Sequence, residues 1–137
     1  IMTYLKPIPF LIIMLLSPFF IKCEKSTTLQ IEFLSGYWEV DFVERNGEQF
    51  RPKISQPLYD FYHVENKKGI RKKVAPKFDG NFQTSEDQTP FDLDLNEGKT
   101  FLHFKTLWDS WSEQIVYLDS TKLVLFHQKS NYHYKRP

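Results

Sequence analysis

Residues 34–42 read LSGYWEVDF, and this stretch decides the fold expected of the chain. Trp38, Val40 and Phe42 share one parity, while the acids between them take the other. An extended backbone would therefore bury an aromatic and aliphatic face and expose the acids to water. Gly36 precedes this face, and its missing side chain lets the backbone turn in tightly. The stretch predicts a first, half-buried β-strand.

An apolar run lies ahead of that strand. Lys6 precedes an almost unbroken apolar stretch from Pro7 to Ile21, and polar residues follow Cys23. A short basic start and an apolar run of about 15 residues are typical of an export signal, and such a run is too short to span a bilayer comfortably. The alternative is a permanent membrane anchor, which the prolines in the run disfavour as a regular helix.

Cys23 is the only cysteine, so no intramolecular disulfide can form and the core must hold the domain together. Its position just after the apolar run resembles the lipobox of bacterial lipoproteins, although Lys22 stands where that motif usually has a small residue. The resemblance implies a lipoprotein-type signal peptide over residues 1–22, a lipid anchor at Cys23 and a polar tether over residues 23–33. The alternative is an incidental thiol in an uncleaved leader.

The charge balance argues against a nucleic-acid partner. The whole chain has 18 basic and 17 acidic side chains, and loss of residues 1–22 removes Lys6 and Lys22 but no acid. The remaining 16 basic and 17 acidic groups give a net charge of −1. Phosphate contacts require a basic surface, so we expect no nucleic-acid binding.

Short strand-like segments separated by turn residues fill the rest of the chain. Asn46-Gly47 is a hairpin signal, and turn residues recur at 66–69, 96–99 and 119–122, with a polar connection at 85–89. Pro52 and Pro57 exclude a central strand between them and predict an irregular crossing or lid. Eight or nine short strands without a helical period predict an all-β fold, a small eight-stranded antiparallel up-and-down β-barrel, because closure removes exposed edges.

Alternation along each strand predicts the inner face of that barrel. Asp60 is expected to face water, which would turn Phe61 and His63 inward. Phe91 and Leu93 alternate with acids in a clean amphipathic strand. An eight-stranded barrel is wide enough either to be filled by side chains or to hold one small ligand, and the many aromatic residues suit both outcomes.

The triplet Gly36-Tyr37-Trp38 resembles the G-x-W signature of lipocalins, within the calycins, and residues 111–125 are similar to the late hairpin of short bacterial lipocalin-like lipoproteins. The resemblance covers residues 34–136. It implies an eight-stranded barrel domain over residues 34–137, with the tryptophan packed at the closed end beneath a basic residue of the final strand. Arg136 is the candidate for that partner.

No catalytic, metal or cofactor motif stands out. The chain has no G-x-S-x-G, no glycine-rich phosphate loop and no His-Glu-x-x-His or paired-cysteine spacing, so we expect no enzyme and no cofactor. His63 and His127 share an inward parity and could hold a metal or haem, but a histidine at a wet rim or bonded to a backbone carbonyl is the simpler interpretation.

The first functional hypothesis is a lipid-anchored, lipocalin-like protein of the bacterial envelope, in the outer membrane, that binds a small apolar ligand in its barrel. The alternative is a filled barrel that acts as a structural or protein-interaction module, docking an envelope protein through residues 52–57 or the turn at 108–111. The predicted ligand-binding residues are Trp38, Val40, Phe42, Phe61, His63, Phe91, Leu93, Phe104, Leu125 and Tyr132; the predicted structural residues are Gly36, Trp38 and Arg136.

Overall fold

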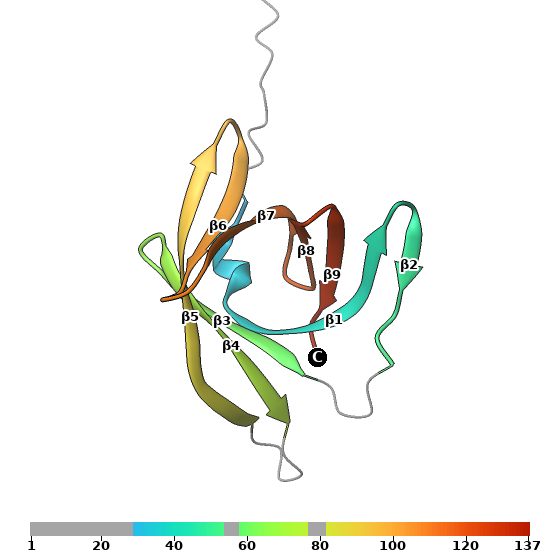
Figure 1. Ribbon diagram of the computed structural model, residues 1–137, viewed down its shortest axis with the longest axis horizontal. Helices are drawn as coiled ribbons and strands as arrows, with labels where there is room; N and C mark the ends of the chain where they lie inside the picture. Colours follow the sequence, from blue (N-terminus) through green and yellow to red (C-terminus); the bar gives the residue numbers. More distant parts are fainter. Residues whose placement is uncertain (1–28, 54–57, 77–81) are drawn as a thin grey trace, which may run out of the picture.

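The computed structural model describes residues 29–53, 58–76 and 82–137, so the leader, Cys23 and Pro57 lie outside the described residues. Almost all of the described chain is extended and belongs to one antiparallel sheet (Figure 1). Its elements in chain order are the 3-10 helix η1 (Ile31–Leu34) and the strands β1 (Gly36–Arg45), β2 (Glu48–Phe50), β3 (Tyr59–Glu65), β4 (Lys68–Pro76), β5 (Phe82–Asn96), β6 (Lys99–Lys105), β7 (Ser110–Leu118), β8 (Lys122–His127) and β9 (Ser130–Lys135).

The sheet closes into a barrel through its first and last strands. Strands β3 to β9 follow one another as hydrogen-bonded neighbours, β1 pairs with β3, and β9 returns to pair with β1. Among the described residues, β1 and β3 to β9 therefore form a ring of eight antiparallel strands. The predicted eight-stranded, up-and-down barrel is confirmed.

Strand β2 is an addition to this ring. It forms the predicted hairpin with β1, with Asn46 and Gly47 both at positive φ in the turn. Strands β2 and β3 share one edge of β1: Val43 pairs with Phe50, and Glu39 pairs with Tyr59. Residues 51–58 connect β2 to β3 and include the predicted irregular crossing. Part of this predicted crossing, residues 54–57, lies outside the described residues.

Strand β5 corrects the predicted polar connection at 85–89. The backbone stays extended from Phe82 to Asn96 and pairs with β4 on both sides of a register shift. Lys72 pairs with Gln88, whereas Val74 pairs with Thr84. A bulge thus absorbs the extra residues inside one long strand, and the pairing with β4 resumes on its other side.

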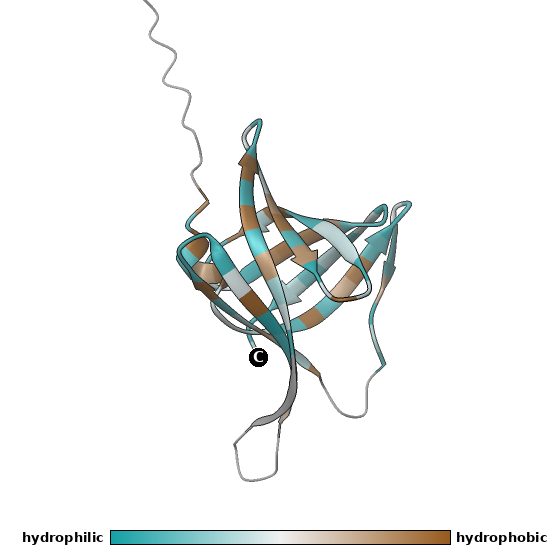
Figure 2. Ribbon diagram, turned by 60° about the vertical axis from the view of Figure 1, so that its left-hand side comes forward, coloured by the Kyte–Doolittle hydropathy of each residue, from teal (hydrophilic) through white to brown (hydrophobic). Residues whose placement is uncertain are grey.

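The core lies inside the ring and continues into η1. Bands of apolar and polar residues alternate along the strands (Figure 2), as expected where only one face of a sheet is buried. Leu34 of η1 is fully buried, and η1 contacts both β3 and β7, which lie on opposite sides of the ring. The 3-10 helix therefore covers one end of the barrel. Within the described ranges no helix is long and apolar enough to cross a membrane.

Candidate ligand site in the barrel

Most of the predicted ligand residues lie on the inner wall. Trp38, Phe91, Phe104 and Leu125 belong to the buried core, and Val40, Leu93 and Tyr132 are partly buried against it. The inner wall is therefore aromatic and aliphatic, as the alternation of the sequence predicts. Ligand binding by these residues stays a prediction.

Phe42 does not face the lumen. The register between β1 and β9 shifts between Val40 and Phe42, because Val40 pairs with Tyr134 while Phe42 already pairs with His133. This bulge reverses the parity, so the Phe42 ring stacks outside the barrel on His133, with ring centroids 4.1 Å apart. The inward orientation expected for Phe42 is wrong.

The whole of β3 has the opposite parity to the predicted one. Asp60 is 1% exposed and Tyr62 is fully buried, so Phe61 and His63 take the outer face. Phe61 packs there against Tyr37, with ring centroids 5.0 Å apart, and the side chain of His63 is 60% exposed. An inner carboxylate is possible here because β4 supplies cationic partners to the same region of the lumen.

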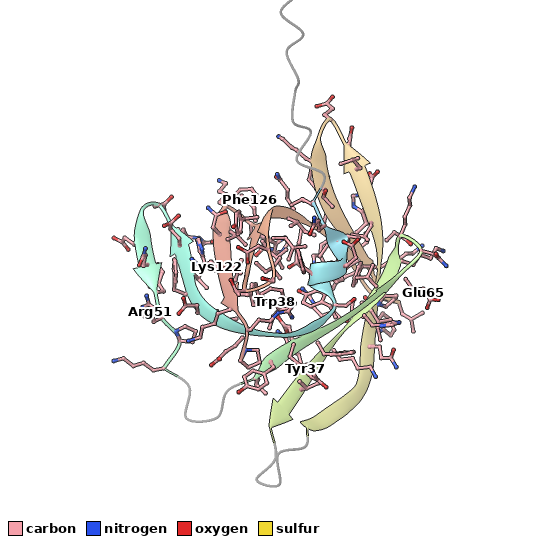
Figure 3. The ribbon with its side chains drawn as sticks, turned by 180° about the vertical axis from the view of Figure 1, so that it is seen from behind. Tyr37, Trp38, Arg51, Glu65, Lys122 and Phe126 are labelled. Carbon is pink, nitrogen blue, oxygen red and sulfur yellow. The ribbon has the colours of Figure 1, made fainter. Side chains whose placement is uncertain are left out.

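The closed end of the barrel holds the stacked pair that the resemblance implied. The guanidinium carbon of Arg136 lies 3.7 Å from the ring centroid of Trp38, and the indole Nε1 donates to the carbonyl of Leu34 at 2.8 Å. Figure 3 shows Trp38 inside the ring of strands. Arg136 also donates to the carbonyls of Phe33 at 2.6 Å and Tyr37 at 3.0 Å. One side chain thus joins the end of the last strand to η1 and to the start of β1.

Gly36 is required where this pair meets the backbone. Its φ is +114°, a region that side-chain-bearing residues rarely adopt. A Cβ added there would lie 2.9 Å from Nη1 of Arg136. The glycine of the G-x-W triplet therefore makes room for the arginine as well as for the turn.

An ion pair crosses the lumen farther from η1. Arg71 of β4 donates from Nη1 to both carboxylate oxygens of Glu113 on β7, at 3.1 and 2.9 Å. These strands are not neighbours in the ring, and both side chains are largely buried, 16% and 8% exposed. The indole Nε1 of Trp111 donates to the same carboxylate at 2.9 Å. Glu113 therefore has three donor contacts.

Aromatic rings surround this ion pair. The guanidinium carbon of Arg71 lies 4.1 Å from the ring centroid of Phe104, which stacks on Trp111 with an interplanar angle of 12°. Phe104 also packs against Phe91, and Phe91 packs edge-on against Tyr62. A continuous series of rings thus lines the wall from β3 to β7. Such a wall suits a flat or aliphatic molecule.

The two innermost phenols stay protonated. Burial raises the pKa of the Tyr62 hydroxyl well above its usual value, with Arg71 opposing the rise. Burial likewise raises the pKa of Tyr134. Both groups are therefore neutral throughout the physiological pH range, so the formal charges of the lumen come from its carboxylates and basic side chains.

A second ion pair lies at the ends of β3 and β4 away from η1. The ammonium of Lys73 contacts Oδ1 of Asp60, and these residues are direct cross-strand partners. The carboxylate is buried, whereas the Lys73 side chain is 61% exposed. Asp60 is thus held in the wall by a side chain that itself extends into solvent.

A Ser-His-Asp array occurs on the outer wall. Nδ1 of His103 lies 2.5 Å from Oγ of Ser112, and its Nε2 lies 3.1 Å from Oδ2 of Asp94. The His103 and Asp94 side chains are 43% and 51% exposed, and the three residues lie on consecutive strands. These hydrogen bonds pair polar side chains with one another on an exposed surface, which is a sufficient reason for the arrangement. No group of three or more His, Cys, Asp or Glu side chains that could hold a metal occurs among the described residues.

The fold is lipocalin-like. It combines a closed up-and-down barrel of eight strands, a short helical turn over one end and an arginine stacked on the first-strand tryptophan. No protein-family model matches the chain, and no curated protein matches its sequence.

Solved structures with similar folds come from bacteria and from a crustacean. A lipocalin-like protein from Bacteroides uniformis is 10% identical, with a TM-score of 0.46, and the match covers 77% of this chain and 99% of that one. An uncharacterized protein from Bacteroides eggerthii is 8% identical over 76% of this chain and 99% of its own, also with a TM-score of 0.46. Lobster apocrustacyanin A1 is 15% identical over 79% of this chain and 63% of its own, again with a TM-score of 0.46. These are similarities of fold.

The ionic groups of the lumen are the part of this lipocalin-like site that the sequence pattern did not reveal. Arg71 and Lys73 belong to a basic run that is typical of a solvated strand edge, and residues 115–118 are apolar at both parities, so the pattern does not orient Glu113. One signal could have identified the first two: they alternate within β4, so they share a face. Their acidic partners come from other strands, and no local pattern links them.

Proposed function

We propose that this protein is an exported, lipid-anchored lipocalin-like binding protein that takes a small, mainly apolar molecule into its barrel. One observation carries the proposal. Leu34 and Trp38, at the end covered by η1, are fully buried, whereas Val40, Trp111 and Tyr132 pack against the core and keep part of their surface exposed. An apolar wall that solvent still reaches can gain free energy by covering itself with a ligand, at roughly 25 cal/mol per Å².

Binding can be tested with an uncharged fluorescent probe. N-phenyl-1-naphthylamine brightens in apolar surroundings, so saturable enhancement followed by displacement with membrane lipids would support the proposal. Absence of saturable binding to the wild-type protein would refute it.

A matched pair of valine substitutions locates the site. Val40→Phe adds a ring to the inner wall and should weaken probe binding by at least about tenfold through lost space. Val116, which is 50% exposed, provides the control, because Val116→Phe makes the same change without narrowing the lumen. Equal effects of the two substitutions would place the bound probe outside the barrel.

The export and anchoring parts of the proposal rest on residues 1–33. The apolar run and Cys23 support them through their resemblance to a lipoprotein signal. Metabolic labelling with a radioactive fatty acid should mark the wild type and spare Cys23→Ser. Equal labelling of both would refute acylation at Cys23.

A second candidate function, a filled barrel that binds a protein partner, has its own supporting observations. The Arg71–Glu113 pair occupies part of the lumen, and Leu107 and Trp108 are 95% and 93% exposed at the turn between β6 and β7. Replacing both turn residues with serine should then abolish partner cross-linking while leaving probe fluorescence unchanged. Retained cross-linking would exclude this turn as the docking surface.

A further inference from the structure

Among the described residues, Asp60 and Glu113 are buried carboxylates of the lumen, and they differ in how well they are satisfied. Glu113 receives two contacts from Arg71 and one from Trp111. Asp60 is almost completely buried, yet neither of its oxygens has a hydrogen bond of good geometry among the described residues, and its only ion-pair contact there is from Lys73 to Oδ1. A buried carboxylate without full hydrogen bonding is costly to the fold.

The lumen offers little to an anionic ligand. Arg71 is the more buried of the two cations, and Glu113 already neutralises it through both carboxylate oxygens. An anionic group would have to displace Glu113 and leave that carboxylate buried without its partner. The unused hydrogen-bonding capacity therefore belongs to the Asp60 carboxylate, so a matching ligand must supply a hydrogen-bond donor.

Lys73 shows what kind of donor Asp60 accepts. Its ammonium reaches the carboxylate from a side chain that is 61% exposed, so Asp60 lies within one side-chain length of solvent. Exchange of that ammonium for a ligand's ammonium would return Lys73 to water and keep the buried carboxylate paired. An ammonium attached to an apolar ligand could take its place, with its apolar part against Trp111 and Tyr132, whose side chains keep part of their surface exposed.

We propose that Asp60 is the polar anchor of the ligand site and that it selects small apolar molecules ending in a protonated amine. This inference rests on the proposed function, since it names the chemical class that the barrel binds. Lys73 occupies the anchor in the ligand-free protein and acts as an internal competitor.

Three eight-carbon probes test the selection. Octylamine, octanol and octanoate share one apolar chain and differ in the polar end, and at pH 7 the amine is protonated. Each compound is added to protein that already holds N-phenyl-1-naphthylamine, and the loss of probe fluorescence measures displacement. Octylamine should displace it at about tenfold lower concentration than octanol, the gain typical of a charge-assisted hydrogen bond, and octanoate should be weakest.

Three variants then assign the preference to Asp60. Asp60→Asn should bring octylamine and octanol within about twofold of each other, because the neutral amide attracts no ammonium. Asp92→Asn is the matched control on an exposed carboxylate of β5, and it should keep the wild-type order. Lys73→Met should strengthen octylamine binding severalfold, since the competing ammonium is gone.

The outcomes separate the two proposals. If the fluorescent probe itself does not bind, the proposed function fails. If it binds but octylamine displaces it no better than octanol, the function stands and the anchor role of Asp60 is overturned. Should Asp60→Asn fail to fold, the Lys73→Met variant decides: weaker or unchanged octylamine binding overturns the inference, and stronger binding supports it.

Discussion

Truncating Arg136 should open the closed end of the barrel. The side chain donates to the carbonyls of Phe33 and Tyr37 at 2.6 and 3.0 Å and stacks on Trp38 at 3.7 Å. Each of the two hydrogen bonds is worth about 1 kcal/mol once the freed carbonyls regain water, and the stack adds about 0.5–2 kcal/mol. Arg136→Ala should therefore lower the free energy of unfolding by about 3 kcal/mol, or roughly 10–20 °C in Tm for a domain of this size.

Urea unfolding followed by tryptophan fluorescence measures this loss, because Trp38 reports directly on the stacked ring. Arg136→Lys keeps the charge but not the planar group that stacks and donates in several directions, so it should recover less than half of the lost stability. Lys135→Ala provides the control, since Lys135 forms a loose 3.9 Å ion pair with Asp41 at the surface, and it should cost no more than about 0.5 kcal/mol. An Arg136→Ala variant as stable as this control would refute the reasoning.

Three further predictions concern the wall, the lumen and a turn. Gly69→Ala should destabilise the protein by about 1–3 kcal/mol in chemical denaturation, because the new Cβ would lie 2.7 Å from Cε2 of Phe91; a neutral result would contradict this packing. Arg71→Met and Glu113→Leu should each cost about 3–5 kcal/mol alone and less than their sum together, which a double-mutant cycle tests; simple additivity would exclude the ion pair. The hydrogen bond from Tyr117, together with two backbone amides, holds the pKa of Asp119 well below its usual 3.8. The ionised carboxylate therefore stabilises the fold fully above pH 3.8, and this stabilisation is lost as the pH falls through the lowered pKa of the folded state. In unfolding titrations the stability of Asp119→Ala should depend less on acid pH than that of the wild type, and equal profiles would contradict the assignment.

The architecture could be predicted because it depends on signals that repeat locally. Alternating side chains give the strands, and Asn46-Gly47 gives a hairpin, so the number and order of the strands follow from the sequence. The polar residues at 85–89 misled the prediction, since polarity indicates exposure and says little about whether a backbone pairs. A long strand at a barrel wall can carry such residues across a bulge.

The candidate site could be predicted only in part, because inner and outer faces differ by a single residue of register. On β1 the bulge before Phe42 reverses the orientation, and nothing in the local sequence marks that bulge. On β3 aromatic residues occupy both parities, so the position of Asp60 was assigned from its charge alone. Its partner, Lys73, is on the next strand, and the neighbouring Arg71–Glu113 pair joins strands that are distant in sequence.

Closure of the barrel also bears on how the chain folds. Glu39 pairs with Lys135, and Val43 pairs with Tyr132, so the contacts that complete the ring join segments about 90 to 100 residues apart. Bringing such distant segments together costs chain entropy before any stabilisation is gained, and folding dominated by these pairings is slow, typically milliseconds to seconds. Until β9 arrives, β1 and β8 each present an open edge. The native ring therefore cannot form before the last strand is available.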